Sequence, residues 1–172
     1  MSGSNHEPAT DGEYVVPRVP ASAGALIFDR RRRLLILKPT YKSGWTIPGG
    51  VMESDGETPW QACQREVREE TGLDIGTGRL VCTDFRLPTE RSPGGIRFLF
   101  DCGALPDSAL TAVVLQAEEI AEYRLVRLAD ALSLLRKPIR RRVRAVRKRN
   151  GAPRKHAPVY LENGRPPVRQ TH

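Results

Sequence analysis

The chain has 172 residues, a length that suits one domain with a substantial core and short tails. Apolar residues make up 39% and charged residues 28%, which excludes a disordered composition, and no apolar run approaches the roughly 18 residues of a membrane-spanning helix. The formal net charge is +8, but residues 136–155 hold 11 of the 28 Lys+Arg and none of the 20 Asp+Glu, so the basicity belongs to one C-terminal segment.

The first residues predict a tail rather than a targeting signal. Residues 1–19 are polar, contain Gly, Ser and Pro, and show no periodicity, so we expect a flexible N-terminal tail. They lack the apolar centre of a secretory signal, which favours a cytoplasmic location.

The three cysteines are odd in number and form no Cys-x-x-Cys pair. A disulfide framework or zinc site is therefore not expected, and the cysteines are predicted to be small buried side chains.

Two short aliphatic runs, residues 21–29 and 34–39, flank four consecutive arginines. We interpret them as a β-hairpin with an arginine-rich turn at residues 30–33. The next segment, residues 43–50, reads "SGWTIPGG", and its proline and glycine pair is expected to break a short strand into a loop.

Residues 58–71 carry strong helix signals. Thr58 is a suitable N-cap, Pro59 fits the first helical position, and Gln61 at the third completes a capping box. Gly72 fits a C-terminal stop. One side of this helix is an apolar stripe that can dock on a sheet, and it consists of Trp60, Cys63 and Val67.

The second half of the chain predicts further strands and helices. The strands are expected at residues 79–87, 95–103, 122–128 and, late in the chain, 158–164. The helices are expected at residues 128–137, ending before Pro138, and at 139–149, with Ile139, Val143 and Val146 on one side. Strands around a central helix indicate the α/β (α+β) class, in a sandwich of helices and a sheet.

The predicted helix at residues 58–71 has an acidic flank. Glu66, Glu69 and Glu70 are spaced i, i+3 and i+4, and like charges at this spacing repel one another. The arrangement becomes favourable around a hard divalent cation such as Mg²⁺ or Mn²⁺, which prefers oxygen ligands. Arg65 lies eight residues after Glu57 and four before Glu69, so it can pair with either and orient a carboxylate.

These residues resemble the signature of the Nudix hydrolases. The resemblance is carried by Glu57, seven intervening residues, and then "REVREETGL" from Arg65 to Leu73, preceded by Gly49-Gly50. It covers about residues 20–137, which gives three expected parts: the tail 1–19, a Nudix domain at 20–137 and a basic extension at 138–172, formed by a packed helix and a loose end. One residue more than usual separates Gly50 from Glu57.

The resemblance implies an α/β/α sandwich with a mixed sheet and a central acidic catalytic helix. The implied reaction is the Mg²⁺- or Mn²⁺-dependent hydrolysis of a pyrophosphate bond in a nucleoside diphosphate linked to another group. Glu66, Glu69 and Glu70 would be metal ligands, helped by a backbone carbonyl of the glycine pair, most simply Gly50. Glu57 and Arg65 would be the orienting pair.

The general base and the substrate-binding residues are less strongly marked. The resemblance implies a base from a loop outside the helix, and we favour Glu119, with Glu118 as the next candidate. Trp45 is the best placed of the aromatic residues to stack on a base, and Pro88 lies fifteen residues beyond Leu73, as in some ADP-ribose-cleaving members of the family. Both ADP-ribose-like compounds and nucleoside triphosphates are open as substrates.

The basic segment at residues 136–155 leaves three interpretations open. It is a packed helix with solvated arginines, a region that attracts substrate phosphates, or a polynucleotide-binding segment. Two rival functions follow: a decapping-like hydrolase of RNA 5′ ends, and a nucleotide- or nucleic-acid-binding regulator without turnover. A homodimer is also consistent with the resemblance.

Overall fold

The computed structural model describes residues 18–90, 92–150 and 157–167, so the tail predicted at residues 1–19 and the loose C-terminal end lie mostly outside the described residues. Its elements, in chain order, are β1 (Ala21–Phe28), β2 (Arg33–Pro39), β3 (Gly49–Val51), α1 (Pro59–Thr71), β4 (Arg79–Arg86), β5 (Gly95–Ala104), α2 (Asp107–Thr111), β6 (Ile120–Arg127), α3 (Leu128–Leu134), α4 (Lys137–Asn150) and β7 (Val159–Glu162).

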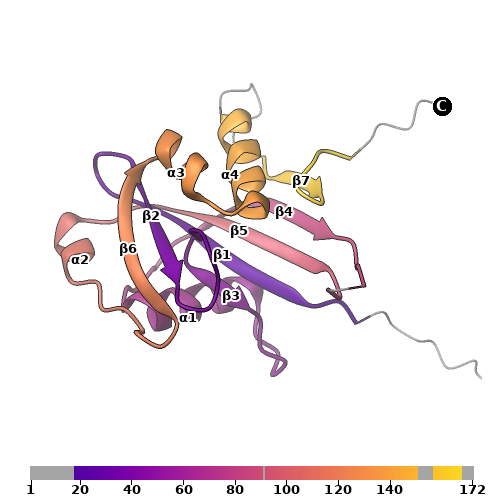
Figure 1. Ribbon diagram of the computed structural model, residues 1–172, viewed down its shortest axis with the longest axis horizontal. Coiled ribbons are helices and arrows are strands. Elements are labelled where there is room, and N and C mark those ends of the chain that lie inside the picture. The colour runs from indigo at the N-terminus through magenta and orange to yellow at the C-terminus, as the bar shows by residue number, and fades with distance from the viewer. Residues whose placement is uncertain (1–17, 91, 151–156, 168–172) are drawn as a thin grey trace, which may run out of the picture.

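The strands form one mixed sheet in the order β6-β2-β1-β5-β4-β7, with β3 paired to β1. The pairs β1–β5 and β4–β7 are parallel, and the other pairs are antiparallel. Helix α1 covers one face of the sheet, and α3 and α4 cover the opposite face (Figure 1). The predicted fold class, a sandwich of helices around a mixed sheet, is therefore confirmed.

The predicted arginine-rich hairpin is present. β1 and β2 pair antiparallel, and Arg32 in the turn adopts a left-handed φ of 60°. The buried Asp29 carboxylate accepts hydrogen bonds of 2.6 Å from the backbone N–H of Arg33 and from its Nε. These bonds and the charge of Arg33 hold the pKa of Asp29 below its usual value, although burial alone would raise it.

Helix α1 has the predicted capping box. The Thr58 side chain accepts a hydrogen bond from the Gln61 N–H, and the Gln61 side chain accepts one from the Thr58 N–H. Gly72 ends the helix in the left-handed conformation, with a φ of 69°. Cys63 and Val67 are fully buried against the sheet, so one face of α1 belongs to the core and the acidic flank is left at its edge.

The opposite face carries a second apolar cluster. In β1, Ala25 and Ile27 face α1 while Leu26 belongs to the second cluster, as the alternation of a strand requires. Val143 and Val146 of α4 are buried in that cluster, as the apolar side of the predicted helix required.

Two predicted boundaries in this region were wrong. The helix expected at residues 128–137 ends at Leu134, and Lys137 already begins α4. Proline lacks an N–H, and the first turn of a helix needs none, so Pro138 opens the second helix instead of marking the stop of the first. β7 then pairs with β4, so the region after residue 138 contributes both a helix and a strand to the packed molecule.

The cysteines fit the sequence interpretation. Cys63, Cys82 and Cys102 are all buried and free. No helix within the described part of the chain is long and apolar enough to cross a membrane.

Candidate functional site

The acidic flank of α1 lies beside the loop that precedes β6. Glu66 and Glu70 feel the negative charges of Glu69, which shares their helix, and of Glu119, which belongs to that loop. The structure thus brings together four carboxylates from two segments that are about fifty residues apart. Only three of them share a helix, and the fourth arrives through the tertiary fold.

Glu70 is the most buried of the four, with 6% of its surface exposed. Its Oε2 accepts a 2.7 Å hydrogen bond from the Gly49 N–H. Burial raises the pKa of Glu70 to about 8, and the charges of Glu66, Glu119 and Glu69 add to this effect, while the Gly49 bond opposes it. Burial likewise raises the pKa of Glu66, against the opposing effect of Arg65. The site therefore holds negative charge that the protein alone does not fully compensate.

Arg65 organises the outer part of the flank. Its Nε and Nη2 donate to the two oxygens of Glu57 at 2.8 and 3.2 Å, and its Nη2 also donates to the Val51 carbonyl. Its Nη1 donates to Glu66 at 3.0 Å and to Glu69 at 2.9 Å. The hydrogen bonds from Arg65 lower the pKa of Glu57. Both pairings that the spacing allows, with Glu57 and with Glu69, are thus made by one guanidinium.

The glycine pair lies in a strand, which corrects the expected loop. Gly49–Val51 is β3, and it pairs with β1, because two glycines can follow a neighbouring backbone too closely for any side chain. A Cβ on Gly49, whose φ is +138°, would lie 2.2 Å from the Ala23 carbonyl oxygen. A Cβ on Gly50 would lie 2.4 Å from Oε1 of Glu66. The extra residue before Glu57 therefore leaves both glycines in contact with the acidic flank.

Glu119 is positioned through its backbone. Its carbonyl accepts a 2.8 Å hydrogen bond from the Thr40 N–H, and its own N–H donates to the Gln116 carbonyl. The Gln116 N–H in turn donates to the Glu70 carbonyl at 3.4 Å. This chain of bonds ties the loop to the end of α1, which is why the charge of Glu119 acts on Glu66 and Glu70. Glu119 and its neighbour Glu118 are both exposed, and the Thr40 hydroxyl donates to the backbone carbonyls of both.

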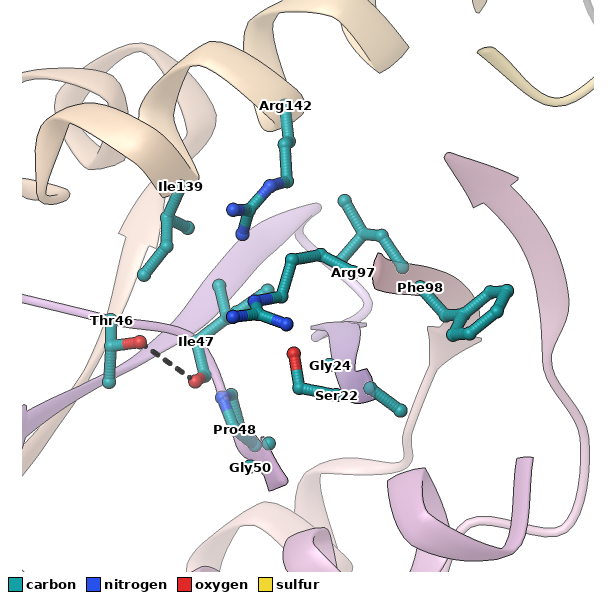
Figure 2. A pocket seen from close by; sticks show the side chains of 13 residues that line it. Ser22, Gly24, Thr46, Ile47, Pro48, Gly50, Arg97, Phe98, Ile139 and Arg142 are labelled. Carbon is teal, nitrogen blue, oxygen red and sulfur yellow. Dashed lines mark hydrogen bonds between the residues drawn. The ribbon is translucent and has the colours of Figure 1, made fainter. Parts of the chain in front are cut away.

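A cavity of about 150 Å³ opens on the other side of the glycine pair. Arg97 of β5 and Arg142 of α4 point into it, and the Ser22 hydroxyl lies on its floor (Figure 2). Burial lowers the pKa of Arg97, and so do the nearby guanidiniums of Arg142 and Arg86. Gly49 and Gly50 line the cavity and also contact the acidic flank, so one strand separates a carboxylate cluster from a cationic cavity.

Sequence reasoning missed Arg97 and Arg142. Arg97 lies within the apolar strand "GIRFLFDCG", where one charged residue is easily assigned to the solvent face. Arg142 lies among many arginines, and only its position three residues after Ile139 places it beside the buried stripe of α4. The one sequence signal for Arg142 was its position next to the apolar side of the predicted helix.

The two residues predicted to bind substrate lie elsewhere. Trp45 is 8% exposed, bridges to Leu135, and carries the Arg124 guanidinium 4.7 Å from its ring centre. Its ring belongs to the second core cluster and does not line the cavity. Pro88 is exposed in the connection between β4 and β5 and does not line the cavity either. The structure therefore brings neither residue to the cationic cavity.

Comparison with known proteins identifies the family. The model of the NUDIX domain matches residues 18–146, about three quarters of the chain. The chain belongs to the NUDIX domain family. A MutT-like protein of Streptomyces ambofaciens is 30% identical over 126 residues, which cover 67% of this chain and 79% of that protein.

Other Nudix relatives agree with this assignment. The 8-oxo-dGDP phosphatase NUDT18 of Danio rerio is 35% identical over 80 residues, but these span 45% of this chain and only 23% of that protein. The MutT protein of Methanosarcina mazei Go1 has a solved structure with a TM-score of 0.66 and 26% identity, covering 77% of this chain and 96% of that one. Its similarity extends the agreement from sequence to fold.

The acidic flank of this Nudix chain fits a divalent cation by its chemistry. Its donors are carboxylate oxygens, which suit hard cations, and the absence of a Cβ on Gly50 lets the Glu66 carboxylate lie against the backbone of the glycine pair. Among the described residues, no three His, Cys, Asp or Glu side chains already form a metal-ligand cluster. Glu66 and Glu69 are instead bonded to Arg65, and Glu70 to Gly49, so their oxygens point at hydrogen-bond donors.

Proposed function

We propose that this protein hydrolyses a pyrophosphate bond in a nucleoside diphosphate linked to another moiety, with Mg²⁺ or Mn²⁺ as cofactor. One observation carries the proposal: the acidic flank of α1 lies beside Gly49-Gly50 and within electrostatic reach of Glu119, and burial, together with the charges of Glu66, Glu119 and Glu69, raises the pKa of Glu70 to about 8. Carboxylates that the protein compensates only in part, next to a cavity lined by arginines, are what a dication and a diphosphate together would neutralise.

The metal-binding residues of the proposal are Glu66, Glu69 and Glu70, with a backbone carbonyl of the glycine pair, Gly50 in particular. A dication held there would supply charge neutralisation on the phosphate oxygens and would make a water molecule more acidic. The burial of Glu70 excludes bulk water from one side of the site, which strengthens every charge interaction in it.

The remaining residues have positioning and proton-transfer roles. Arg65 is held by Glu57 through two hydrogen bonds and in turn fixes the carboxylates of Glu66 and Glu69. Glu119 is our proposed general base, because it is the one carboxylate of the four that comes from outside α1 and has no metal-binding role in the proposal. Backbone hydrogen bonds fix its loop. In the proposal its carboxylate therefore stays free to accept a proton and forms no ion pair with Arg65.

The substrate would extend from the carboxylates into the cationic cavity. Arg97 and Arg142 line this cavity. Nη1 and Nη2 of Arg97 already donate to the Ile96 and Gly94 carbonyls, and Nε of Arg142 donates to Asp84. Their remaining N–H groups would bind phosphate oxygens or the acceptor edge of a base. The names of relatives suggest the first compounds to test, which are oxidised and ordinary guanine nucleoside diphosphates and triphosphates. ADP-ribose-like compounds are also tested, because the sequence analysis left them open as substrates.

The deciding experiment is a substrate panel. The full chain is incubated with Mg²⁺ or Mn²⁺ and guanine nucleotides, their 8-oxo forms, ADP-ribose and capped RNA, and products are separated by chromatography. We expect cleavage of at least one small nucleotide and dependence on the cation. Cleavage of capped RNA alone would establish the decapping-like rival, and no product from any compound would favour the regulator without turnover.

The proposed base has a matched control in its neighbour. Glu119→Gln should lower kcat by about 10²–10⁴-fold, as loss of a positioned proton acceptor does, with KM little changed. Glu118→Gln, which alters an exposed side chain one residue away, should keep normal turnover. Equal rates for the two variants would remove Glu119 from the mechanism.

A further inference from the structure

A second cationic cavity lies away from the carboxylates. It has a volume of about 280 Å³ and is bordered by the end of β4, the start of α4 and the turn after β7. Its charged lining residues are Asp84, Arg86, Lys137 and Arg141. A water molecule occupies about 30 Å³ in the liquid, so the space is ample for a group of phosphate size.

The single carboxylate of this cavity is already neutralised. Asp84 is fully buried, its Oδ2 accepts a 2.7 Å hydrogen bond from Nε of Arg142, and its Oδ1 accepts a 2.8 Å bond from the Gly164 N–H. Both oxygens of Asp84 are therefore engaged, by a cation that lines the first cavity and by the turn after β7. The other three charged side chains of the cavity are cations that Asp84 does not balance.

Each of these three cations has unused hydrogen-bonding capacity. Nε of Arg86 is buried and has no hydrogen-bond partner among the described residues, which is costly for a guanidinium N–H. The aliphatic stem of Arg141 lies against Gly164, and within the described part of the chain its guanidinium donates only to the Asn163 carbonyl, at 3.3 Å. Lys137 makes no ion pair with any residue that the structure describes.

The backbone adds to this positive potential. Lys137 and Pro138, the first residues of the fourteen-residue helix α4, line the cavity, so the positive end of the helix dipole lies at its wall. Nearby, burial lowers the pKa of Arg97, and the guanidiniums of Arg142 and Arg86 lower it further, as expected where cations lie close together. A bound anion would reduce the repulsion among these arginines. In the same way, a bound cation would reduce the repulsion among the carboxylates of the acidic flank.

We propose that this cavity binds a phosphate group through Arg86, Lys137 and Arg141. The group is either free inorganic phosphate or the distal phosphate of a substrate that reaches past the Asp84–Arg142 pair from the first cavity. Binding of free phosphate does not depend on the proposed hydrolysis, whereas binding of a substrate's distal phosphate rests on it. In both cases the same three cations would recognise a phosphate group.

The first test measures inorganic phosphate binding to the full chain by calorimetry, in EDTA and at constant ionic strength set with chloride. We expect saturable binding to the wild type, and binding about tenfold or more weaker in Arg86→Gln, Arg141→Gln and Lys137→Gln. Lys137 is exposed, so its variant does not endanger the fold. Arg144→Gln, which changes an exposed cation elsewhere on α4, should bind as the wild type does.

A variant of the carboxylate site separates this proposal from the proposed function. Glu70→Gln should retain full phosphate binding even where it has lost hydrolysis. No binding to the wild type, equal binding by the three cavity variants and the wild type, or loss of binding in Glu70→Gln would each overturn the phosphate site.

A second test distinguishes the two sources. If the site takes the distal phosphate, Lys137→Gln raises KM for substrates with long phosphate chains, such as dinucleoside polyphosphates, but not for nucleoside diphosphates, and inorganic phosphate competes with the long substrates. If the site takes free phosphate, the variant loses phosphate binding and keeps every KM.

Discussion

Glu70 shows how one residue serves two opposing demands. Its backbone belongs to the last turn of α1, where burial is needed for packing, yet its side chain is a carboxylate beside three others. The Gly49 N–H compensates only part of the penalty. In the cation-free protein the Glu70 carboxylate is therefore destabilising at high pH, and the cation that we propose would offset this penalty.

The first prediction concerns the pH dependence of stability. The pKa of Glu70 is raised to about 8 in the folded chain, above its unfolded value, so the folded state holds a proton that the unfolded state has lost. Without divalent cations, the free energy of unfolding should fall as pH rises from about 5 to about 8. Glu70→Gln should flatten that fall, which denaturant titrations at several pH values can measure. An unchanged pH profile in the variant would contradict the raised pKa.

The second prediction concerns Gly50. A Cβ there would lie 2.4 Å from Oε1 of Glu66, so Gly50→Ala must displace this carboxylate or the strand. We expect kcat/KM to fall by roughly 10–100-fold, as for displaced residues that orient a metal site, with the fold retained. Gly76→Ala is the matched control, because nothing lies within 4 Å of its added Cβ. Similar activity in the two variants would mean that Glu66 does not need its present position.

At the scale of elements, α1 joins three requirements in thirteen residues. Its capping box fixes where the helix begins, and the buried Cys63 and Val67 fix which face packs on the sheet. The spacing of the glutamates from the cap and from these two residues then places the carboxylates at the edge beside β3. A shift of one residue at the start would rotate the acidic flank by about 100°. The cap is therefore part of the site, although it lies away from the chemistry.

The third prediction tests the cap. Thr58→Ala removes the hydroxyl that accepts from the Gln61 N–H at 3.3 Å, and it should lower the free energy of unfolding by about 1 kcal/mol. Thr77→Ala, at an exposed position outside helices and strands, should change it by less than about 0.5 kcal/mol. Urea titration of both variants measures the difference, and equal stabilities would show that the cap contributes little.

At the scale of the whole molecule, the Asp84–Arg142 pair connects the sheet, α4 and the turn after β7. It also stands between the two cationic cavities, since Arg142 lines one and Asp84 the other. The basic segment thus has a packed part: α4 buries Val143 and Val146 and directs Arg142 inward. Among the interpretations of that segment, a packed helix describes residues 137–150, while residues 151–155 lie outside the described structure.

The fourth prediction concerns this pair. Asp84→Ala leaves Arg142 and the Gly164 N–H without their partner in a buried place, and it should lower the free energy of unfolding by about 3–5 kcal/mol. Asp130→Ala breaks an exposed pair with Arg127 and should change stability by less than about 1 kcal/mol. Thermal and urea unfolding of both variants give the comparison. A small effect at Asp84 would mean that water or another group replaces it.

The sequence by itself determined the local features of this protein. The hairpin, the bounds and cap of α1, its buried stripe and the acidic flank all depend on residues within a few positions of one another, where periodicity and capping rules act. The Nudix resemblance is visible in the amino-acid sequence for the same reason, since its signature lies within one short segment. At this scale the boundary between α3 and α4 failed, because Pro138 can either end one helix or begin the next, and the short helix α2 was not predicted.

Only the tertiary structure decided which distant residues meet. It turned Gly49-Gly50 into a strand against β1, brought Glu119 to Glu70, buried Trp45, and placed Arg97 and Arg142 in one cavity. These outcomes depend on sheet order and on which face each helix covers, and neither is encoded in a short window of residues. A charged residue in a strand or helix looks the same in sequence whether it faces water or a cavity, because only packing distinguishes the two.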